Sequence, residues 1–143
     1  MGKITTVLVA DDYELIRSAL CGLVNNTIGF QVIAACADGA EAVRLARRHK
    51  PDILLTDIDM PIMNGLSAAS LVLQNLPDTR VLIVSSHADR MYLEAAKRAG
   101  ARGYLAKRDA AEHIGIALRL IRDGEWFASP SLNYVGFERS AGF

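Results

Sequence analysis

Residues 52–65 read Asp-Ile-Leu-Leu-Thr-Asp-Ile-Asp-Met-Pro-Ile-Met-Asn-Gly and contain the clearest strand-to-loop transition in the sequence. A short apolar run ends in Thr56 and Asp57, and Pro61 and Gly65 then mark a loop before the next helical pattern. Such a run predicts a buried parallel strand that delivers one carboxylate to its C-terminal end. Open α/β sheets build their sites at that edge. A lone Asp in this position is also common in turns, so the other strand ends must decide.

The rest of the chain alternates short apolar runs with helical patterns. Strands are expected at 4–10, 30–35, 53–56, 81–84 and 102–105, and helices at 13–24, 40–49, 66–76, 90–99 and 110–122. Asp89 and Asp109 are the expected N-caps of the last two helices. Strands that alternate with helices through short connections predict an α/β fold. The expected architecture is a flavodoxin-like (βα)5 doubly wound parallel sheet with strand order 2-1-3-4-5.

Composition narrows the class of protein. The 143 residues suit one domain, and 16 basic residues balance 16 acidic ones, which argues against a generic surface for nucleic acid or anionic membrane. Cys21 and Cys36 lack a metal or redox spacing and are expected to be reduced thiols. The N-terminus does not fit a signal peptide, and no apolar run is long enough to span a bilayer. A cytoplasmic protein without a membrane partner is therefore predicted.

Polar residues stand at the ends of four predicted strands. Asp11 and Asp12 follow the first, Asp57 the third, Ser85 the fourth and Lys107 the fifth. The predicted strand order makes these strands neighbours, so the side chains should converge. Three close carboxylates raise one another's pKa, and a hard divalent cation such as Mg²⁺ removes that conflict. One terminal Asp, Ser or Lys is usually a cap or a solvated residue, whereas four suitable strand ends together favour a site.

The expected Mg²⁺ ligands are Asp12 and Asp57 directly, Asp11 through water, and the main-chain carbonyl of Asp59. Such a set suits phosphoryl transfer onto a carboxylate, with Asp57 as the nucleophile. Lys107 and the metal would neutralise charge on the phosphoryl oxygens. The Ser85 hydroxyl could donate a hydrogen bond to one of them.

The sequence resembles the receiver domains of two-component response regulators. The resemblance covers about residues 4–123 and is carried by four motifs: Val7–Asp12, Leu54–Gly65, Ile83–Ser86 and Gly103–Lys107. It implies that Asp57 accepts a phosphoryl group from a sensor histidine kinase with Mg²⁺ as cofactor. It implies no enzyme beyond self-phosphorylation and slow self-dephosphorylation. It also implies a switch in which the Ser85 hydroxyl moves toward the phosphoryl group and the Tyr104 ring rotates inward, biasing a surface of the fourth helix, fifth strand and fifth helix.

Residues 9–17 and 123–130 look like the NarL/FixJ subfamily, which joins a receiver to a DNA-binding helix-turn-helix and so regulates transcription. We therefore expect a receiver domain at 1–124 and a tail or linker remnant at 125–143, with DNA contacted only through an output domain absent from this chain. The chain is either excised from a longer regulator or a receiver that acts alone by protein contact. A homodimer could use four positions on the last helix: Leu118, Arg119, Ile121 and Arg122. Packing of an amphipathic helix on its own sheet explains the two apolar positions equally well.

Several residues depart from the family pattern or lie close in sequence to the predicted site residues. Arg108 follows Lys107 where many receivers have a proline after a cis peptide, Ser85 replaces a commoner threonine, and Ser86 replaces a usual alanine. Asp59 and His87 each lie two residues past a site residue and are predicted to tune the dephosphorylation rate. The tail carries five aromatic residues: Trp126, Phe127, Tyr134, Phe137 and Phe143. In one interpretation Trp126 and Phe127 pack back on the last helix and the rest of the tail frays. In the other, the tail docks on another protomer or on a partner.

Two other functions compete with the receiver. An Mg²⁺-dependent phosphohydrolase would use Asp59 as a general acid and base, but the chain lacks the extra loops or cap domain that would bind a substrate. A flavodoxin-like FMN binder is disfavoured, because Asp11 and Asp12 would repel a phosphate where such a protein needs a phosphate cradle.

Overall fold

The computed structural model describes residues 2–132 as alternating strands and helices. The strands are β1 (Thr5–Ala10), β2 (Phe30–Cys36), β3 (Ile53–Thr56), β4 (Arg80–Ser85), β5 (Gly103–Ala106) and β6 (Phe127–Ala128). The helices are α1 (Glu14–Asn25), α2 (Gly39–His49), α3 (Gly65–Asn75), α4 (Arg90–Arg98) and α5 (Ala110–Arg122), with short 3₁₀ turns η1 (Lys107–Asp109) and η2 (Pro130–Leu132).

The strands form one parallel sheet in the order β2-β1-β3-β4-β5-β6. This confirms the predicted flavodoxin-like order and adds a sixth strand. β6 pairs with β5 through Gly103 opposite Phe127 and Tyr104 opposite Ala128. A strand of two residues carries no periodic signal, which explains why the sequence did not reveal it.

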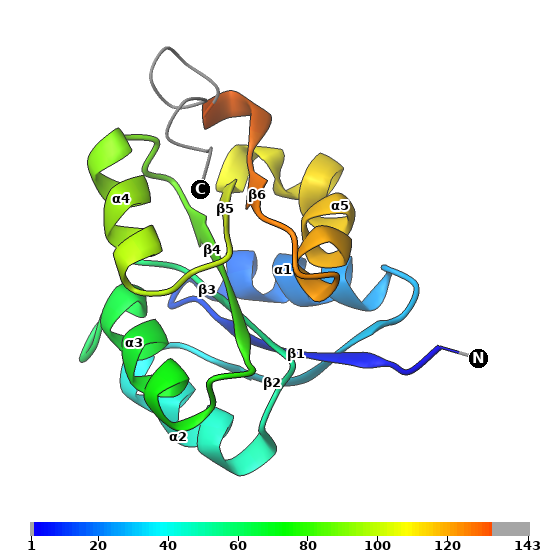
Figure 1. The fold of residues 1–143 in the computed structure, drawn as a ribbon, viewed down its shortest axis with the longest axis horizontal. Coiled ribbons are helices and arrows are strands. Elements are labelled where there is room, and N and C mark those ends of the chain that lie inside the picture. Colours follow the sequence, from blue (N-terminus) through cyan, green and yellow to red (C-terminus); the bar gives the residue numbers. More distant parts are fainter. Residues whose placement is uncertain (1, 133–143) are drawn as a thin grey trace.

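Helices cover both faces of the sheet, with α1 and α5 on one face and α2, α3 and α4 on the other (Figure 1). Alternate residues of β1 supply the two cores: Val7 and Val9 pack with α1 and α5, while Leu8 and Ala10 pack with the other helices. All four side chains of β3 are buried, as the apolar run predicted. The carboxyl end of β3 therefore emerges from the middle of a rigid core.

The structure shows which side chains of α1 and α5 are buried in the core. Leu118 and Ile121 of α5 are fully buried in this domain's own core, so a dimer through α5 would have to use other side chains. Leu15 of α1 is 73% exposed although its side chain is apolar. Leu20 and Val24 are the buried residues of α1, and Ile16, Cys21 and Leu23 are partly buried against the same core.

Helix capping differs from expectation. Asp89 and Asp109 stand at the N-cap positions of α4 and α5, as predicted, but within the described residues neither makes a side-chain cap bond to its helix. Asp38 caps α2 by accepting from the Glu41 N–H at 2.7 Å, and Asn64 caps α3 in the same way. The Asp109 carboxylate turns toward the segment after α5.

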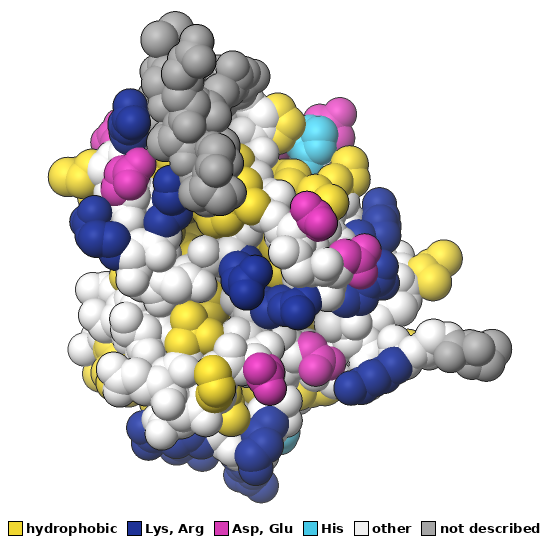
Figure 2. Space-filling model, in the orientation of Figure 1, with side chains coloured by type: hydrophobic (Ala, Val, Ile, Leu, Met, Phe, Trp, Pro, Cys, Tyr) yellow, Lys and Arg dark blue, Asp and Glu magenta, His cyan; other side chains and the backbone are white. Residues whose placement is uncertain are grey.

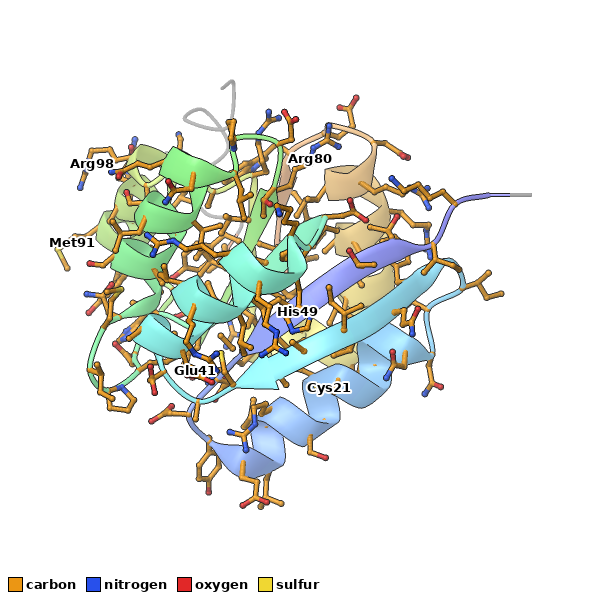
Figure 3. All side chains as sticks on the ribbon, turned by 90° about the horizontal axis from the view of Figure 1, so that it is seen from below. Cys21, Glu41, His49, Arg80, Met91 and Arg98 are labelled. Atoms are coloured by element: carbon orange, nitrogen blue, oxygen red, sulfur yellow. The ribbon has the colours of Figure 1, made fainter. Side chains whose placement is uncertain are left out.

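The surface carries mixed charge. On the face shown in Figure 2, Lys and Arg side chains are interspersed with Asp and Glu. Cys21 lies on α1 (Figure 3) and Cys36 at the end of β2, and both are free thiols. Burial raises the pKa of the Cys36 thiol to about 11. Within residues 2–132, no helix is both long and apolar enough to cross a membrane.

Candidate functional site

The predicted acidic residues meet at one edge of the sheet. Asp11, Asp12 and Asp57 bring carboxylate oxygens within 4.8 Å of one another. Main-chain bonds hold two of these residues in place, because the Asp57 N–H donates to the Ala10 carbonyl at 2.9 Å and the Asp11 N–H donates to the Cys36 carbonyl at 3.0 Å. Asp11 is fully buried, Asp57 is 4% exposed and Asp12 faces solvent. The sheet thus determines where the three carboxylates meet.

Lys107 brings a positive charge into this cluster. Its ammonium nitrogen lies 3.1 Å from Asp11 Oδ2 and 3.0 Å from Asp57 Oδ2. Burial raises the pKa of Asp57 even though Lys107 opposes that shift, so removal from water outweighs the ion pair. For Lys107, burial acts to lower the pKa, but the contacts with Asp57 and Asp11 prevail and leave it above the ordinary lysine value. One ammonium among three carboxylates leaves the site negative.

The donor set fits a hard divalent cation. Asp11 Oδ2 is fully buried and shares the Lys107 ammonium with Asp57. One ammonium does not balance three close carboxylates, and coordination to a cation or to its water shell would supply the missing positive charge. Asp12, Asp57 and the Asp59 main-chain carbonyl are the other oxygens that the sequence assigned to Mg²⁺.

Ser85 and Tyr104 are joined through the backbone of His87. The Ser85 hydroxyl accepts from the His87 N–H at 3.0 Å, and the Tyr104 hydroxyl donates to the His87 carbonyl at 2.9 Å. Tyr104 is 1% exposed, and burial raises its pKa to about 12. The Tyr104 ring therefore lies inside the domain in this structure, and its hydroxyl contacts the loop that follows Ser85.

Residues 7–119 match the sequence pattern of the response regulator receiver domain. The chain belongs to this family of receivers. It is 33% identical over 127 residues to the oxygen regulatory protein NreC of Staphylococcus epidermidis, an alignment that covers 88% of this chain and 58% of NreC. It is 32% identical over 128 residues to the transcriptional regulatory protein DegU of Brevibacillus brevis, covering 90% of this chain and 54% of DegU. The receiver thus spans little more than half the length of these curated relatives.

Solved structures agree with this assignment. A LuxR-family response regulator from an Aurantimonas species superimposes with a TM-score of 0.86 at 29% identity, covering 91% of this chain and 93% of that one. The signal receiver domain of a NarL response regulator from Mycobacterium tuberculosis superimposes with a TM-score of 0.82 at 31% identity, covering 87% of this chain and all of that one. Both likenesses support the flavodoxin-like receiver fold.

Asp59 and His87 form a bridge at the rim of the receiver's site. His87 Nε2 lies 2.5 Å from Asp59 Oδ2, so the loop after β3 is tied to the loop after β4. The His87 ring also stacks on Tyr92 of α4, with centroids 3.9 Å apart and planes 8° from parallel. The sequence pointed to Asp59 and His87 by position alone, and it did not reveal Tyr92 because that contact crosses from a loop to a helix.

Gly65 has a structural role in the site that the sequence did not reveal. The sequence marked it as a loop residue, but it is the first residue of α3 and its N–H donates to the Ile58 carbonyl at 2.8 Å. A Cβ atom at this position would lie 1.7 Å from the Asp57 carbonyl oxygen. Only a residue without a side chain lets α3 begin so close to the backbone of Asp57.

The structure shows the backbone and side-chain conformation of Arg108, which stands where many receivers have a proline. The peptide bond between Lys107 and Arg108 is trans. The Arg108 side chain extends away from the carboxylates, and its guanidinium lies 3.5 Å from the Ser131 carbonyl oxygen. The residue after Lys107 thus contacts the segment that follows α5.

Proposed function

We propose that Asp57 accepts a phosphoryl group from a phosphohistidine on a sensor histidine kinase. The observation that carries this proposal is the Asp57 carboxylate, buried among Asp11, Asp12 and Lys107 at the carboxyl end of β3. Phosphorylation would then switch a protein-interaction surface of α4, β5 and α5. DegU is named a transcriptional regulatory protein, which favours transcription regulation through a DNA-binding output in a longer protein.

Each residue has a defined part in the transfer. An Asp57 oxygen forms the new bond to phosphorus as the bond from phosphorus to the histidine nitrogen breaks, and the electron pair of that bond returns to the imidazole. The Lys107 ammonium, 3.0 Å from Asp57, neutralises charge that develops on the phosphoryl oxygens. Mg²⁺ held by Asp12, Asp57, the Asp59 carbonyl and, through water, Asp11 would supply further neutralising charge.

The Ser85 hydroxyl is suited to recognise the transferred group. A serine hydroxyl has one hydrogen to donate and can also accept. In this structure the Ser85 hydroxyl oxygen accepts from the His87 N–H, and the hydroxyl also contacts the Tyr104 side chain. On phosphorylation its hydrogen would be donated to a phosphoryl oxygen instead. That new bond would act on the loop that also holds the Tyr104 hydroxyl, which links the site to the switch surface.

The domain organisation is part of the same proposal. We assign the receiver to residues 1–124 and a tail or linker to 125–143, with packing of 127–132 on the domain. Tyr134, Phe137 and Phe143 lie outside the described residues. If the gene encodes a helix-turn-helix after residue 143, the receiver acts through an attached output domain. If it does not, the receiver acts by contact with a separate protein.

Intact mass after incubation with acetyl phosphate tests the proposal. We expect a single phosphoryl adduct that needs Mg²⁺ and is absent from the Asp57→Asn variant, since the amide keeps the shape of the side chain but lacks the nucleophilic carboxylate. Failure of the wild-type protein to form any adduct would contradict the proposed chemistry. Steady turnover of p-nitrophenyl phosphate would instead favour a phosphohydrolase, a reading made less suitable here because the Asp59 carboxylate is engaged by His87.

We further expect the Asp59–His87 bridge to lengthen the lifetime of the phosphoryl group. The bridge ties two loops across the rim of the site, so Asp59→Ala or His87→Ala should admit water more freely and speed dephosphorylation by about fivefold. His113→Ala is the matched control, because His113 also faces a carboxylate, Glu112 at 3.6 Å, but on the surface of α5. Unchanged lifetimes in both bridge variants would remove this role.

A further inference from the structure

We propose that the segment after α5 positions Lys107 for phosphoryl transfer through a clamp made by Asp109, Ser129 and Ser131. This inference rests on the proposed role of Asp57 and Lys107 and adds a positioning residue, Asp109, to it. The turn η1 carries Lys107 at one end, facing the carboxylates, and Asp109 at the other end, facing the segment after α5. A single residue thus separates Lys107, which faces the carboxylates, from Asp109, which faces the segment after α5.

The clamp consists of converging hydrogen bonds. The Asp109 carboxylate oxygen Oδ2 accepts from the Ser129 hydroxyl and from the Ser131 N–H, the latter at 3.3 Å. The Ser129 and Ser131 donors lower the pKa of Asp109, so the carboxylate is held in its charged, accepting form. Arg108 adds its contact with the Ser131 carbonyl at 3.5 Å. Every residue of η1 therefore points either at the carboxylate site or at the clamp.

The clamped segment is itself anchored to the sheet. The Ser129 N–H donates to the Tyr104 carbonyl at 2.9 Å, continuing the pairing of β6 with β5. Ser129 and Leu132 are each 1% exposed, and Leu132 packs in the same core cluster as Tyr104 and Leu93 of α4. The segment emerges beside β5 and follows α5 in Figure 1. It is therefore built into the domain and provides a fixed support for Asp109.

A short turn between two anchors has little freedom to absorb movement. If the clamp is lost, Lys107 can shift relative to Asp57, and displacements of about 1 Å at a reacting group have large effects on rate. The same geometry would also act at equilibrium: if the clamp stabilises the phosphorylated state, the phosphorylated state stabilises the clamp by the same free energy. The same contacts would therefore pass the state of Asp57 to the chain that leaves the domain.

The first test measures adduct formation with acetyl phosphate in variants of the clamp. We expect Asp109→Ala and Ser129→Ala each to lower the maximal rate by about tenfold with little change in the acetyl phosphate concentration for half-maximal rate, since transfer and not binding is affected. The double variant should lose little more than either single one, because both remove the same hydrogen bond. Asp109→Asn keeps an accepting oxygen and should restore most of the rate.

Asp123→Ala is the matched control, because Asp123 follows the other end of α5 and pairs with Arg122 on the surface. It should phosphorylate as the wild type does. Equal maximal rates for wild type, Asp109→Ala and Ser129→Ala would overturn the clamp while leaving the function of Asp57 intact. Absence of an adduct in the wild type would instead overturn the proposed function on which the clamp depends.

The second test follows the reverse coupling by hydrogen exchange at the Ser129 and Ser131 amides. Beryllium fluoride with Mg²⁺, a stable mimic of the phosphoryl group, should change these exchange rates by about tenfold in the wild type. In Asp109→Ala the same amides should exchange fast with or without the mimic. Exchange rates that stay the same in the wild type when the mimic is bound would contradict the proposal.

Discussion

Replacing Lys107 with methionine is expected to lower the free energy of unfolding by about 3 kcal/mol and to slow phosphorylation of Asp57 by about 100-fold. The reason for the first effect is burial. Lys107 is the cation within 3.1 Å of both Asp11 and Asp57, and removal of one partner from a buried ion pair leaves the other charge uncompensated. Proton uptake by Asp57, whose pKa burial already raises, would limit the loss.

The second effect reports on the chemistry. Without the ammonium, charge that develops on the phosphoryl oxygens loses a preorganised partner, so the acetyl phosphate adduct should form slowly even when the variant is folded. Chemical denaturation and intact mass measure the two effects separately. Lys3→Met is the control, because Lys3 is exposed and should alter stability by less than about 0.5 kcal/mol. A Lys107→Met protein with wild-type stability and rate would contradict the role given to Lys107.

Gly65→Ala is expected to be the most damaging single-methyl change in the site. The added Cβ would meet the Asp57 carbonyl oxygen at 1.7 Å and the Thr56 hydroxyl oxygen at 3.0 Å. The first of these is backbone, so the clash can be relieved only by moving α3 or Asp57 itself. We expect a loss of about 3 kcal/mol or more in the free energy of unfolding, with a matching loss of phosphorylation because Asp57 is displaced.

Gly22→Ala provides a matched control in the same protein. Gly22 lies inside α1, and a Cβ there meets nothing within 4 Å. Alanine should therefore stabilise the domain by about 0.5 to 1 kcal/mol, since glycine is costly inside a helix. Urea denaturation of the two variants measures the contrast. If Gly65→Ala were as stable as the wild type, the close approach of α3 to Asp57 would not be the constraint described here.

Strand ends were readable from the sequence because each is a local transition. A buried strand is a short apolar run, and the residue at which the run stops is visible without any knowledge of the fold, as at Asp57 after β3. Rules of handedness and connection then place neighbouring strand ends together. The structure brings Asp11, Asp12, Asp57 and Lys107 together as these rules required.

Features that depend on a specific long-range contact were not readable. The carboxylate of Asp109 precedes α5 in the place of a cap, yet it binds Ser129 and Ser131 some twenty residues later. Leu15 has an apolar side chain on an amphipathic helix, yet it faces solvent. In both cases several environments suit the residue equally well in isolation, and packing of distant elements selects one.

Local patterns of apolar and polar residues alone were therefore enough to establish the five βα units, their parallel order and the four strand ends that make the acidic site. Tertiary packing produced the rest: the bridge from Asp59 to His87, the close approach of Gly65 to the backbone of Asp57, and the segment after β6 that meets Asp109. Hydrophobic periodicity is a property of neighbours along the chain, so it survives in the sequence. The pairing of two particular polar groups depends on where the whole chain has folded, so only the three-dimensional structure contains it.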